Sequence, residues 1–425
     1  MRPRRHSTLF RLLAVLFTLS LVAAACGGED DDDDAGGGAQ DGELQAGPGF
    51  DGTTIKVGVL TPLSGPVADP IGLPLTAGGD VYWQRVNAEG GIAGQYPVEQ
   101  VKEDTQYDIA QTKAKYTQIK NDVALFSQLL GTPPTQAVLV DLKADDIVAS
   151  PASLESAWVR EPNLLPVGST YEIQFINAAT YLIEERDFAD KPICMVAIEG
   201  AYGDSGLQGL EFAAEQLDFE IAVTARYASG AQDFTAQVQQ LRNANCAAVF
   251  LTSLPSETGR IIGTAAQAGF TPQWVGQSPT WVSALAASQV GPVLQRSFLW
   301  ASEGVQWGDE SVPGMKQMLE DVQKYKPDQQ PDPYFVFGYV QALTVHALLE
   351  QAVENGDLSR EGILEAVTQV EVDYQGLLGG YEYGPAEERS PSRQSTIFSV
   401  DPAVPGSLKS LTQVESDAAK AFEFD

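Results

Sequence analysis

The sequence predicts an α/β fold: two doubly wound lobes with parallel sheets. Over residues 55–400, short apolar runs rich in valine and isoleucine alternate with helical patterns, an alternation typical of parallel sheets covered by helices. The apolar runs end in loops rich in serine, threonine, glycine or proline, which is where such sheets bind ligands. Roughly 370 residues can fold, more than one ordinary core accommodates, so we expect two lobes.

The chain opens on a pattern typical of an export signal. Three arginines within the first five residues precede an apolar run, 12–25, that is too short to span a bilayer. Small residues lead directly to Cys26. We therefore expect residues 1–25 to be a lipoprotein signal peptide and Cys26 to become the lipidated N-terminus, with an ordinary secretory signal as the alternative. The protein would then be extracytoplasmic, held by its lipid anchor on the outer face of the bacterial cell membrane.

Composition limits what the rest of the chain can do. Residues 26–52 are acidic and glycine-rich and cannot bury a core, so we expect a disordered tether. The formal charge of −31 repels phosphate backbones and excludes a nucleic-acid role. Since His346 is the one histidine beyond the predicted signal peptide and cysteines are few, we expect no metal site and no cofactor.

The first lobe begins with a strand, a polar loop and a helix. Residues 55–60 have the apolar character of a buried strand, and 76–87 have a helical pattern that stops at Gly90-Gly91. The following strands are predicted at 98–103, 123–130 and 147–149, and the following helices at 109–121 and 137–143.

This opening resembles that of periplasmic binding proteins of the branched-chain amino-acid (Leu/Ile/Val) type, the solute-binding subunits of ABC importers. The matching residues are Pro62-Leu63-Ser64-Gly65-Pro66, Gly72, Gly78, Asn87, Gly90-Gly91-Ile92 and Gly94. The resemblance implies the type I periplasmic binding protein fold, in which the chain crosses between lobes three times and the crossings join the lobes by a hinge. We therefore expect lobe 1 to comprise 53–172 plus 303–390, and lobe 2 to comprise 173–302 plus 391–425.

The second lobe repeats the alternation. Its strands are predicted at 192–199, 219–227, 247–252, 274–278, 298–302 and 395–400, and residues 408–425 are predicted to be a polar tail. Helices that pack on lobe 1 are predicted at 312–325, 334–355 and 360–370. Cys194 and Cys246 lie near the starts of neighbouring strands in a doubly wound order, so a disulfide is sterically feasible and export would permit it. Two buried free thiols are the alternative.

The resemblance also implies where a ligand binds. The loops after the third and fourth strands of lobe 1 hold a ligand carboxylate in this family, with hydroxyls and backbone N–H groups at helix N-termini. The residues in these loops are Thr132, Thr135, Ser150, Ala152 and Ser153. The alternative is that their hydroxyls only cap helices.

Further cleft residues are expected from other loops. Ser253 and Ser278 follow strands of lobe 2, and the aromatic candidates are Tyr202, Trp281, Tyr107 and Trp158. Ordinary packing is the alternative for each aromatic side chain.

Two departures from the family bear on the ligand. Amino-acid binders of this type pair the ligand ammonium with an acid in the loop after the fourth strand of lobe 2, but here that loop, 276–281, has none. A buried ammonium without a carboxylate is costly, so a small carboxylate, amide or aromatic acid fits better than a zwitterionic amino acid. The first loop is one residue longer at Asp69-Pro70-Ile71, which we expect to reshape the pocket floor.

We therefore predict a monomeric solute-binding lipoprotein that clamps one small ligand, presents it to an ABC permease and performs no chemistry. An extracellular ligand sensor with the same clamp is the alternative. A serine hydrolase using Gly203-Asp204-Ser205-Gly206 is a weaker one, because Ser205 needs a base and His346 lies in the middle of an apolar helical pattern.

Overall fold

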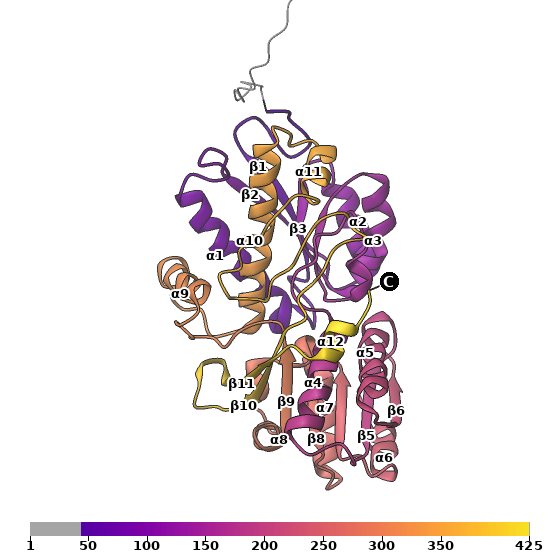
Figure 1. Ribbon diagram of the computed structural model, residues 1–425. Helices are drawn as coiled ribbons and strands as arrows, with labels where there is room; N and C mark the ends of the chain where they lie inside the picture. Colours follow the sequence, from indigo (N-terminus) through magenta and orange to yellow (C-terminus); the bar gives the residue numbers. More distant parts are fainter. Residues whose placement is uncertain (1–43, 425) are drawn as a thin grey trace, which may run out of the picture. The chain divides into compact units, whose positions relative to one another are not determined.

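The computed structural model describes residues 44–424, which form two α/β lobes, each built on one sheet (Figure 1). The predicted signal peptide, Cys26 and residues 26–43 of the predicted tether lie outside the described residues. Among the helices of 44–424, none combines the length and apolar character needed to cross a membrane.

Lobe 1 is built on a four-stranded parallel sheet in the order β2-β1-β3-β4. Its strands are β1 (Ile55–Thr61), β2 (Val98–Asp104), β3 (Leu125–Leu130) and β4 (Ala149–Ala152). Its helices are α1 (Leu73–Ala88), α2 (Ile109–Ile119), α3 (Thr132–Ala144), α9 (Pro313–Tyr325), α10 (Pro333–Glu354) and α11 (Arg360–Ala366). Because all four strands run the same way, the loops after them meet at one edge of the sheet.

Helices α1 and α10 pack side by side in lobe 1 although they are far apart in the sequence (Figure 1). Two glycines permit this close contact. A Cβ atom on Gly78 would lie 2.0 Å from the carbonyl oxygen of Phe335, and one on Gly338 would lie 1.8 Å from that of Leu75. The helix backbones therefore touch at this crossing, where a larger side chain on either glycine would force them apart.

Lobe 2 is built on a seven-stranded sheet in the order β11-β10-β9-β8-β7-β5-β6. The strands from β5 to β9 are parallel, and β10 is antiparallel to both of its neighbours. The strands are β5 (Ile193–Ile198), β6 (Ile221–Tyr227), β7 (Ala248–Thr252), β8 (Gln273–Gly276), β9 (Phe298–Ser302), β10 (Ser395–Val400) and β11 (Leu408–Val414). The two-lobed parallel-sheet fold predicted from the sequence is confirmed.

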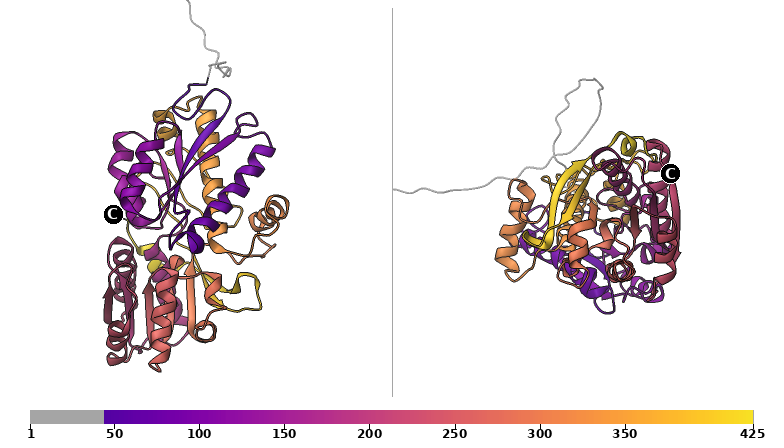
Figure 2. Two further views of the ribbon diagram at one scale, coloured as in Figure 1. Left: turned by 180° about the vertical axis from the view of Figure 1, so that it is seen from behind. Right: turned by 90° about the horizontal axis from the view of Figure 1, so that it is seen from below.

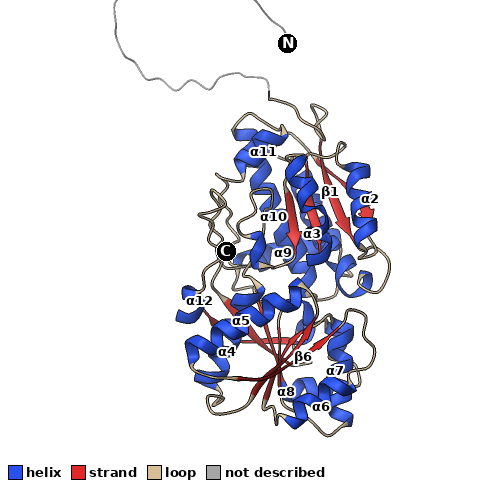
Figure 3. Cartoon of the chain, turned by 90° about the vertical axis from the view of Figure 1, so that its right-hand side faces the viewer, coloured by secondary structure: helices blue, strands red, loops and turns tan. Residues whose placement is uncertain are grey.

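Helices cover both faces of the lobe 2 sheet (Figure 3). One face packs against α4 (Tyr171–Glu185), α5 (Ala201–Leu217) and α12 (Asp417–Ala421), and the other against α6 (Thr235–Asn243), α7 (Pro255–Gln267) and α8 (Gly291–Ser297). Alternate residues of the buried strands supply the two cores, as Cys194 and Val196 do for one face and Ile193 and Met195 for the other. This is the pattern expected of strands buried on both faces.

Cys194 and Cys246 form a disulfide, with their Cα atoms 5.8 Å apart. Strands β5 and β7 are neighbours, and Cys194 lies opposite Val249 in their register. Of the two alternatives left open by the sequence, the structure therefore has the bridge and not two free thiols.

The predicted polar tail at 408–425 is wrong. Its first part is the edge strand β11, which pairs with β10 (Figure 2), and its second part contains α12, after which Phe422 and Phe424 are buried against lobe 2. The segment looks polar in the sequence because alternate residues of an edge strand face solvent. The predicted tether also ends earlier than residue 52, because the Gln45 N–H bonds Gly356 O at 2.9 Å and the Phe50 ring packs edge-on against Tyr96.

The described chain passes between the lobes ahead of α4, after β9 and before β10. Each lobe therefore contains segments that are distant in sequence. The sheet of lobe 1 comes from one continuous segment, to which α9, α10 and α11 return, whereas the sheet of lobe 2 is completed by β10 and β11 after the last crossing.

Candidate ligand-binding site

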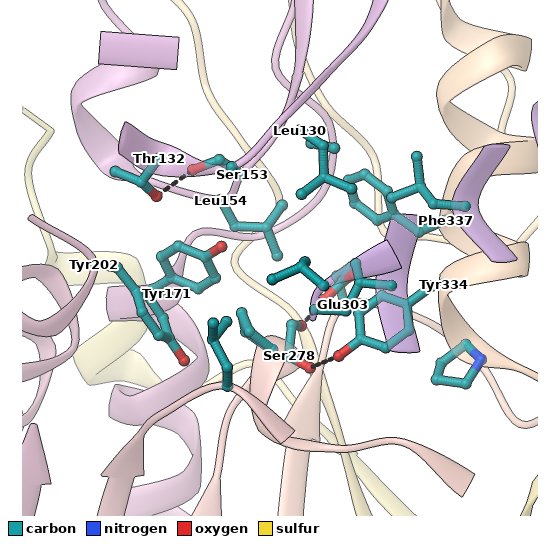
Figure 4. A pocket seen from close by; sticks show the side chains of 18 of the residues that line it. Leu130, Thr132, Ser153, Leu154, Tyr171, Tyr202, Ser278, Glu303, Tyr334 and Phe337 are labelled. Atoms are coloured by element: carbon teal, nitrogen blue, oxygen red, sulfur yellow. Dashed lines mark hydrogen bonds between the residues drawn. The ribbon is translucent and has the colours of Figure 1, made fainter. Parts of the chain in front are cut away.

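A largely apolar cavity lies between the strand-end loops of the two lobes (Figure 4). Lobe 1 contributes the loops after β1, β2, β3 and β4 and the first two turns of α10. Lobe 2 contributes residues after β5, β7, β8 and β9. The lining residues are Val67, Ile71, Leu75, Tyr107, Leu130, Gly131, Thr132, Ala152, Ser153, Leu154, Tyr171, Tyr202, Leu254, Ser278, Pro279, Trp300, Glu303, Pro333, Tyr334 and Phe337.

The floor of the cavity contains a π-helical turn, Ala68–Gly72. The N–H of Gly72 bonds Val67 O at 3.0 Å, which closes the wide turn. This turn includes the position at which the sequence predicts an extra residue. Such turns commonly accommodate one added residue near functional sites. Here Val67 and Ile71 both line the cavity.

A pair of hydroxyls lies in the lobe 1 wall. The Oγ1 of Thr132, at the start of α3, is 2.6 Å from the Oγ of Ser153, which follows β4. The indole Nε1 of Trp158 donates to Ser153 Oγ at 3.0 Å. Because an indole N–H only donates, Ser153 accepts there. Of the two hydroxyl hydrogens of Thr132 and Ser153, one forms the hydrogen bond between them. Only the other is left to donate to a ligand.

A carboxyl group lies at the other side of the cavity wall (Figure 4). Glu303 follows β9, and its Oε2 accepts hydrogen bonds from Gln174 Nε2 at 3.0 Å and Ser302 Oγ at 3.2 Å. Ser278 Oγ also bonds this oxygen. Burial raises the pKa of Glu303, while these hydrogen bonds lower it by a smaller amount.

The tyrosines of the wall are neutral hydrogen-bonding groups. Burial raises the pKa of Tyr107 to about 12, and its ring covers Gly131, on which a Cβ would lie 2.4 Å from the ring. The rings of Tyr171 and Tyr202 pack edge to face, 4.8 Å between centroids. Aromatic pairs of this geometry stabilise the wall beyond the area that they bury.

The structure brings together many of the residues expected from the sequence. Those that line the cavity are Thr132, Ala152, Ser153, Tyr202, Ser278 and Tyr107. They come from both lobes, as a clamp around a ligand requires.

The other expected residues are buried away from the cavity. Thr135 Oγ1 bonds Gly131 O at 2.8 Å, as a helix-start hydroxyl does, and Ser150 Oγ bonds Leu165 O at 3.0 Å. Ser253 Oγ is 2.7 Å from Thr258 Oγ1. Trp281 stacks at a tilt on Phe298 in the lobe 2 core. Trp158 is buried too, and reaches the cavity only through Ser153.

Sequence reasoning missed Glu303 because it sought an acid after the fourth strand of lobe 2. That loop has none, but the neighbouring strand β9 supplies one directly after Ser302. The available signal was an acid immediately following a buried strand. The cavity residues of α10, Tyr334 and Phe337, were also missed, because a helix predicted to pack lobe 1 gives no sign that its first turn meets the cleft.

The residues of the weaker hydrolase alternative are not brought together. Ser205 Oγ donates to Tyr202 O at 3.1 Å in lobe 2. His346 lies in lobe 1 on α10, where its ring nitrogens are 2.7 Å from Tyr82 OH and 3.0 Å from Glu350 Oε1. Within residues 44–424, no cluster of three or more His, Cys, Asp or Glu is arranged to hold a metal ion.

Comparison with known proteins gives consistent matches. The family model described as "Periplasmic binding protein" matches residues 54–405. The Leu/Ile/Val-binding protein of Citrobacter freundii is 24% identical over 340 residues, which cover 78% of this chain and 89% of that protein. The leucine-, isoleucine-, valine-, threonine-, and alanine-binding protein of Pseudomonas aeruginosa is 26% identical over 326 residues, covering 74% and 82%.

Comparison with solved structures also finds proteins of ABC transporters. A fatty acid ABC transporter substrate-binding protein from Thermomonospora curvata has a TM-score of 0.83 and 29% identity, covering 91% of this chain and 98% of that chain. A branched chain amino acid ABC transporter from Thermus thermophilus with bound valine has a TM-score of 0.73 and 18% identity, covering 86% and 98%. The second likeness shows the fold alone.

Proposed function

The chain belongs to the periplasmic binding protein family, and we propose that, as the substrate-binding protein of an ABC importer, it captures a mostly apolar monocarboxylic acid of the fatty-acid class. The family implies an extracytoplasmic location. The proposal includes the lipid anchor at Cys26, a monomeric state and delivery of the closed, loaded form to a membrane permease.

The observation that carries the proposal is the chemistry of the cavity wall. Leucine, valine, isoleucine, proline and aromatic side chains dominate it, and no lysine, arginine or histidine of the described part of the chain lines it. Burial of each ligand methylene in such a wall contributes about 0.8 kcal/mol, so an eight-methylene chain gains about 6 kcal/mol. The likeness to the fatty acid ABC transporter substrate-binding protein from Thermomonospora curvata supports the same class.

The cavity also supports a clamp mechanism. Leu154 reaches it from lobe 1 and Leu254 from lobe 2, so one apolar ligand would touch both lobes. A ligand that contacts both lobes stabilises the closed arrangement over an open one by its differential affinity.

An α-amino acid remains the second candidate because Glu303 supplies a carboxyl group that the sequence did not reveal. An ammonium at Glu303 and a carboxylate at the Thr132–Ser153 pair would need the two groups close together. Figure 4 shows them on different sides of the cavity, with Leu154 and Tyr171 between, which favours a longer ligand.

The test is a calorimetric titration with decanoic acid, leucine, isoleucine, valine and benzoic acid. We expect decanoic acid to bind and the amino acids not to. Leu254→Asn, in the cavity wall, should weaken binding at least tenfold, whereas Leu411→Asn, on an exposed strand position, should not. Binding of leucine, isoleucine or valine in preference to decanoic acid would overturn the proposed ligand class and leave the importer role. Uptake of labelled decanoic acid in cells that lack the gene would separate importer from sensor.

A further inference from the structure

We propose that Glu303 binds the carboxyl group of the ligand as an acid–carboxylate pair that shares one proton, so that this residue selects monocarboxylic acids over the corresponding amines. This inference rests on the proposed function and assigns the polar end of the ligand to one side of the cavity.

The hydrogen bonds of Glu303 leave one oxygen for the ligand. Gln174 Nε2, Ser302 Oγ and Ser278 Oγ all bond Oε2. Within residues 44–424, none of the hydrogen bonds of this side chain reaches Oε1. Glu303 is part of the cavity wall, so Oε1 is the oxygen available to a ligand.

The neighbouring amide fixes which oxygen can carry a proton. Gln174 Oε1 accepts the N–H of Ser278 at 2.9 Å, and this orients the Gln174 amide with its NH₂ group toward Glu303 Oε2. Oε2 accepts from this NH₂ group and also from Ser302 Oγ, so both of its lone pairs are used and it has no room for a proton. A proton on Glu303 therefore resides on Oε1, where it can donate to a ligand carboxylate oxygen.

The surroundings favour the neutral form of Glu303. Among residues 44–424, the other ionisable side chains that line the cavity are Tyr107, Tyr171, Tyr202 and Tyr334, and none of them is a cation. Burial raises the pKa of Glu303. A carboxyl group held neutral in an apolar wall can serve as a hydrogen-bond donor, and two carboxyl groups in contact share a proton because they cannot both ionise.

The hydroxyl pair of lobe 1 is a poorer site for a carboxylate. Thr132 and Ser153 together leave one hydroxyl hydrogen for a ligand. The first turn of α3 carries Pro133 and Pro134, which lack the N–H groups that a helix N-terminus otherwise offers an anion. A carboxylate there would be desolvated with few donors.

The proton balance gives a measurable signature. A ligand carboxylate that binds to ionised Glu303 must take up one proton from solvent. The dissociation constant of decanoic acid should therefore rise with pH, approaching tenfold per pH unit above the pKa of Glu303 in the free protein.

The experiment measures this constant for decanoic acid and for decylamine between pH 5 and pH 9. Wild type, Glu303→Gln and Glu257→Gln are compared. Gln at 303 mimics the protonated acid, so we expect it to keep tight acid binding at pH 5 and to lose most of the pH dependence. Glu257 is a buried acid of lobe 2 that does not line the cavity, so its variant should keep the wild-type slope.

The outcomes separate this inference from the proposed function. If decanoic acid binds and its dissociation constant depends on pH as steeply in Glu303→Gln as in wild type, the inference of a shared proton is wrong and the proposed function stands. If decylamine binds more tightly than decanoic acid and Glu303→Gln abolishes its binding, Glu303 is an ionised partner for a cation and the inference is overturned. If decanoic acid does not bind wild type at any pH, both the ligand class and the inference fail.

Discussion

Tyr334, at the start of α10 in lobe 1, donates a hydrogen bond from its hydroxyl to the carbonyl oxygen of Trp281 in lobe 2 over 2.8 Å. The same hydroxyl lies 3.1 Å from Ser278 O. One side chain of the cavity wall therefore connects the first turn of a lobe 1 helix to the loop after β8. The contact depends on the arrangement of the two lobes seen here.

Replacing Tyr334 by Phe should weaken this arrangement while keeping the ring in the wall. A buried hydrogen bond contributes about 1 kcal/mol, so we expect a lower melting temperature and ligand affinity reduced about fivefold. Differential scanning calorimetry and titration with the proposed ligand measure the two effects. Tyr96→Phe removes a hydroxyl whose bond is to the adjacent, exposed Gln95 and should change neither. Unaltered melting and affinity in Tyr334→Phe would show that the contact does not stabilise the closed lobes.

The α1–α10 crossing predicts opposite outcomes for adjacent glycines. Ala at position 78 would place a Cβ against the backbone of Phe335, so Gly78→Ala should lower the free energy of unfolding by about 1–3 kcal/mol. Gly79 has no neighbouring atom closer than 3.7 Å to such a Cβ. Gly79→Ala should therefore be neutral or stabilise the protein by up to about 1 kcal/mol. Urea unfolding at constant pH measures the free energy of unfolding of both variants. An equal loss of stability in the two would contradict the close backbone contact at Gly78.

Two buried acids near the first lobe crossing predict how stability changes with pH. Burial and the charge of Glu172 raise the pKa of Glu155 to about 8, and burial raises that of Glu172 to about 7. Ser156 Oγ bonds Glu172 Oε1 at 2.8 Å. Both acids hold protons in the folded state that the unfolded chain releases above its pKa of 4.5. The free energy of unfolding should therefore fall as pH rises from about 5 to about 8.

A variant isolates the Glu172 contribution to this pH dependence. Glu172→Gln should reduce the fall and raise stability at pH 8 by about 2 kcal/mol, because a neutral amide replaces a buried carboxylate. Glu184→Gln, on the exposed part of α4, is the matched control and should follow the wild-type profile. Chemical unfolding at each pH gives the comparison. A free energy of unfolding that rises between pH 5 and pH 8 in wild type would contradict the predicted direction of the pH dependence.

The Cys194–Cys246 disulfide closes a sequence separation of 52 residues. Loop entropy for a bridge of this span predicts stabilisation of about 4 kcal/mol at most, with about 2–4 typical. Replacing both cysteines by alanine should lower the melting temperature in non-reducing buffer. Adding a reductant should lower the melting temperature of wild type toward that of the variant and leave the melting temperature of the variant unchanged. An identical melting temperature for the two proteins would show that the bridge contributes no stability.

The sequence predicted the fold better than it predicted which side chains face the cavity. The alternation of strands and helices was sufficient for the two sheets and for the loops at their carboxyl edges. Within a loop, however, a shift of one residue turns a side chain away. The fourth strand was predicted at 147–149 and runs Ala149–Ala152, and of its two candidate serines Ser153 lines the cavity while Ser150 bonds Leu165.

Residues that reach the cavity through long-range packing could not be predicted. Glu303 enters because β9 lies beside β8, and Tyr334 enters because α10 packs on α1. Trp281 was expected at the ligand because it follows the fourth strand of lobe 2, yet it packs on Phe298. Local pattern gives the order of elements, but contacts between distant segments decide which side chains surround the ligand.

The pairing of α1 with α10 also determines when the protein can fold during its synthesis. Helix α1 ends at residue 88 and α10 begins at residue 333, so the ribosome makes most of the polypeptide before α1 can meet its partner. Until then the apolar face that carries Trp83 and Val86 stays uncovered, and contacts of such long sequence separation form slowly. A nascent chain in this state cannot complete lobe 1 early. Because the protein works outside the cytoplasm, this delay in folding favours its export across the membrane as an unfolded chain.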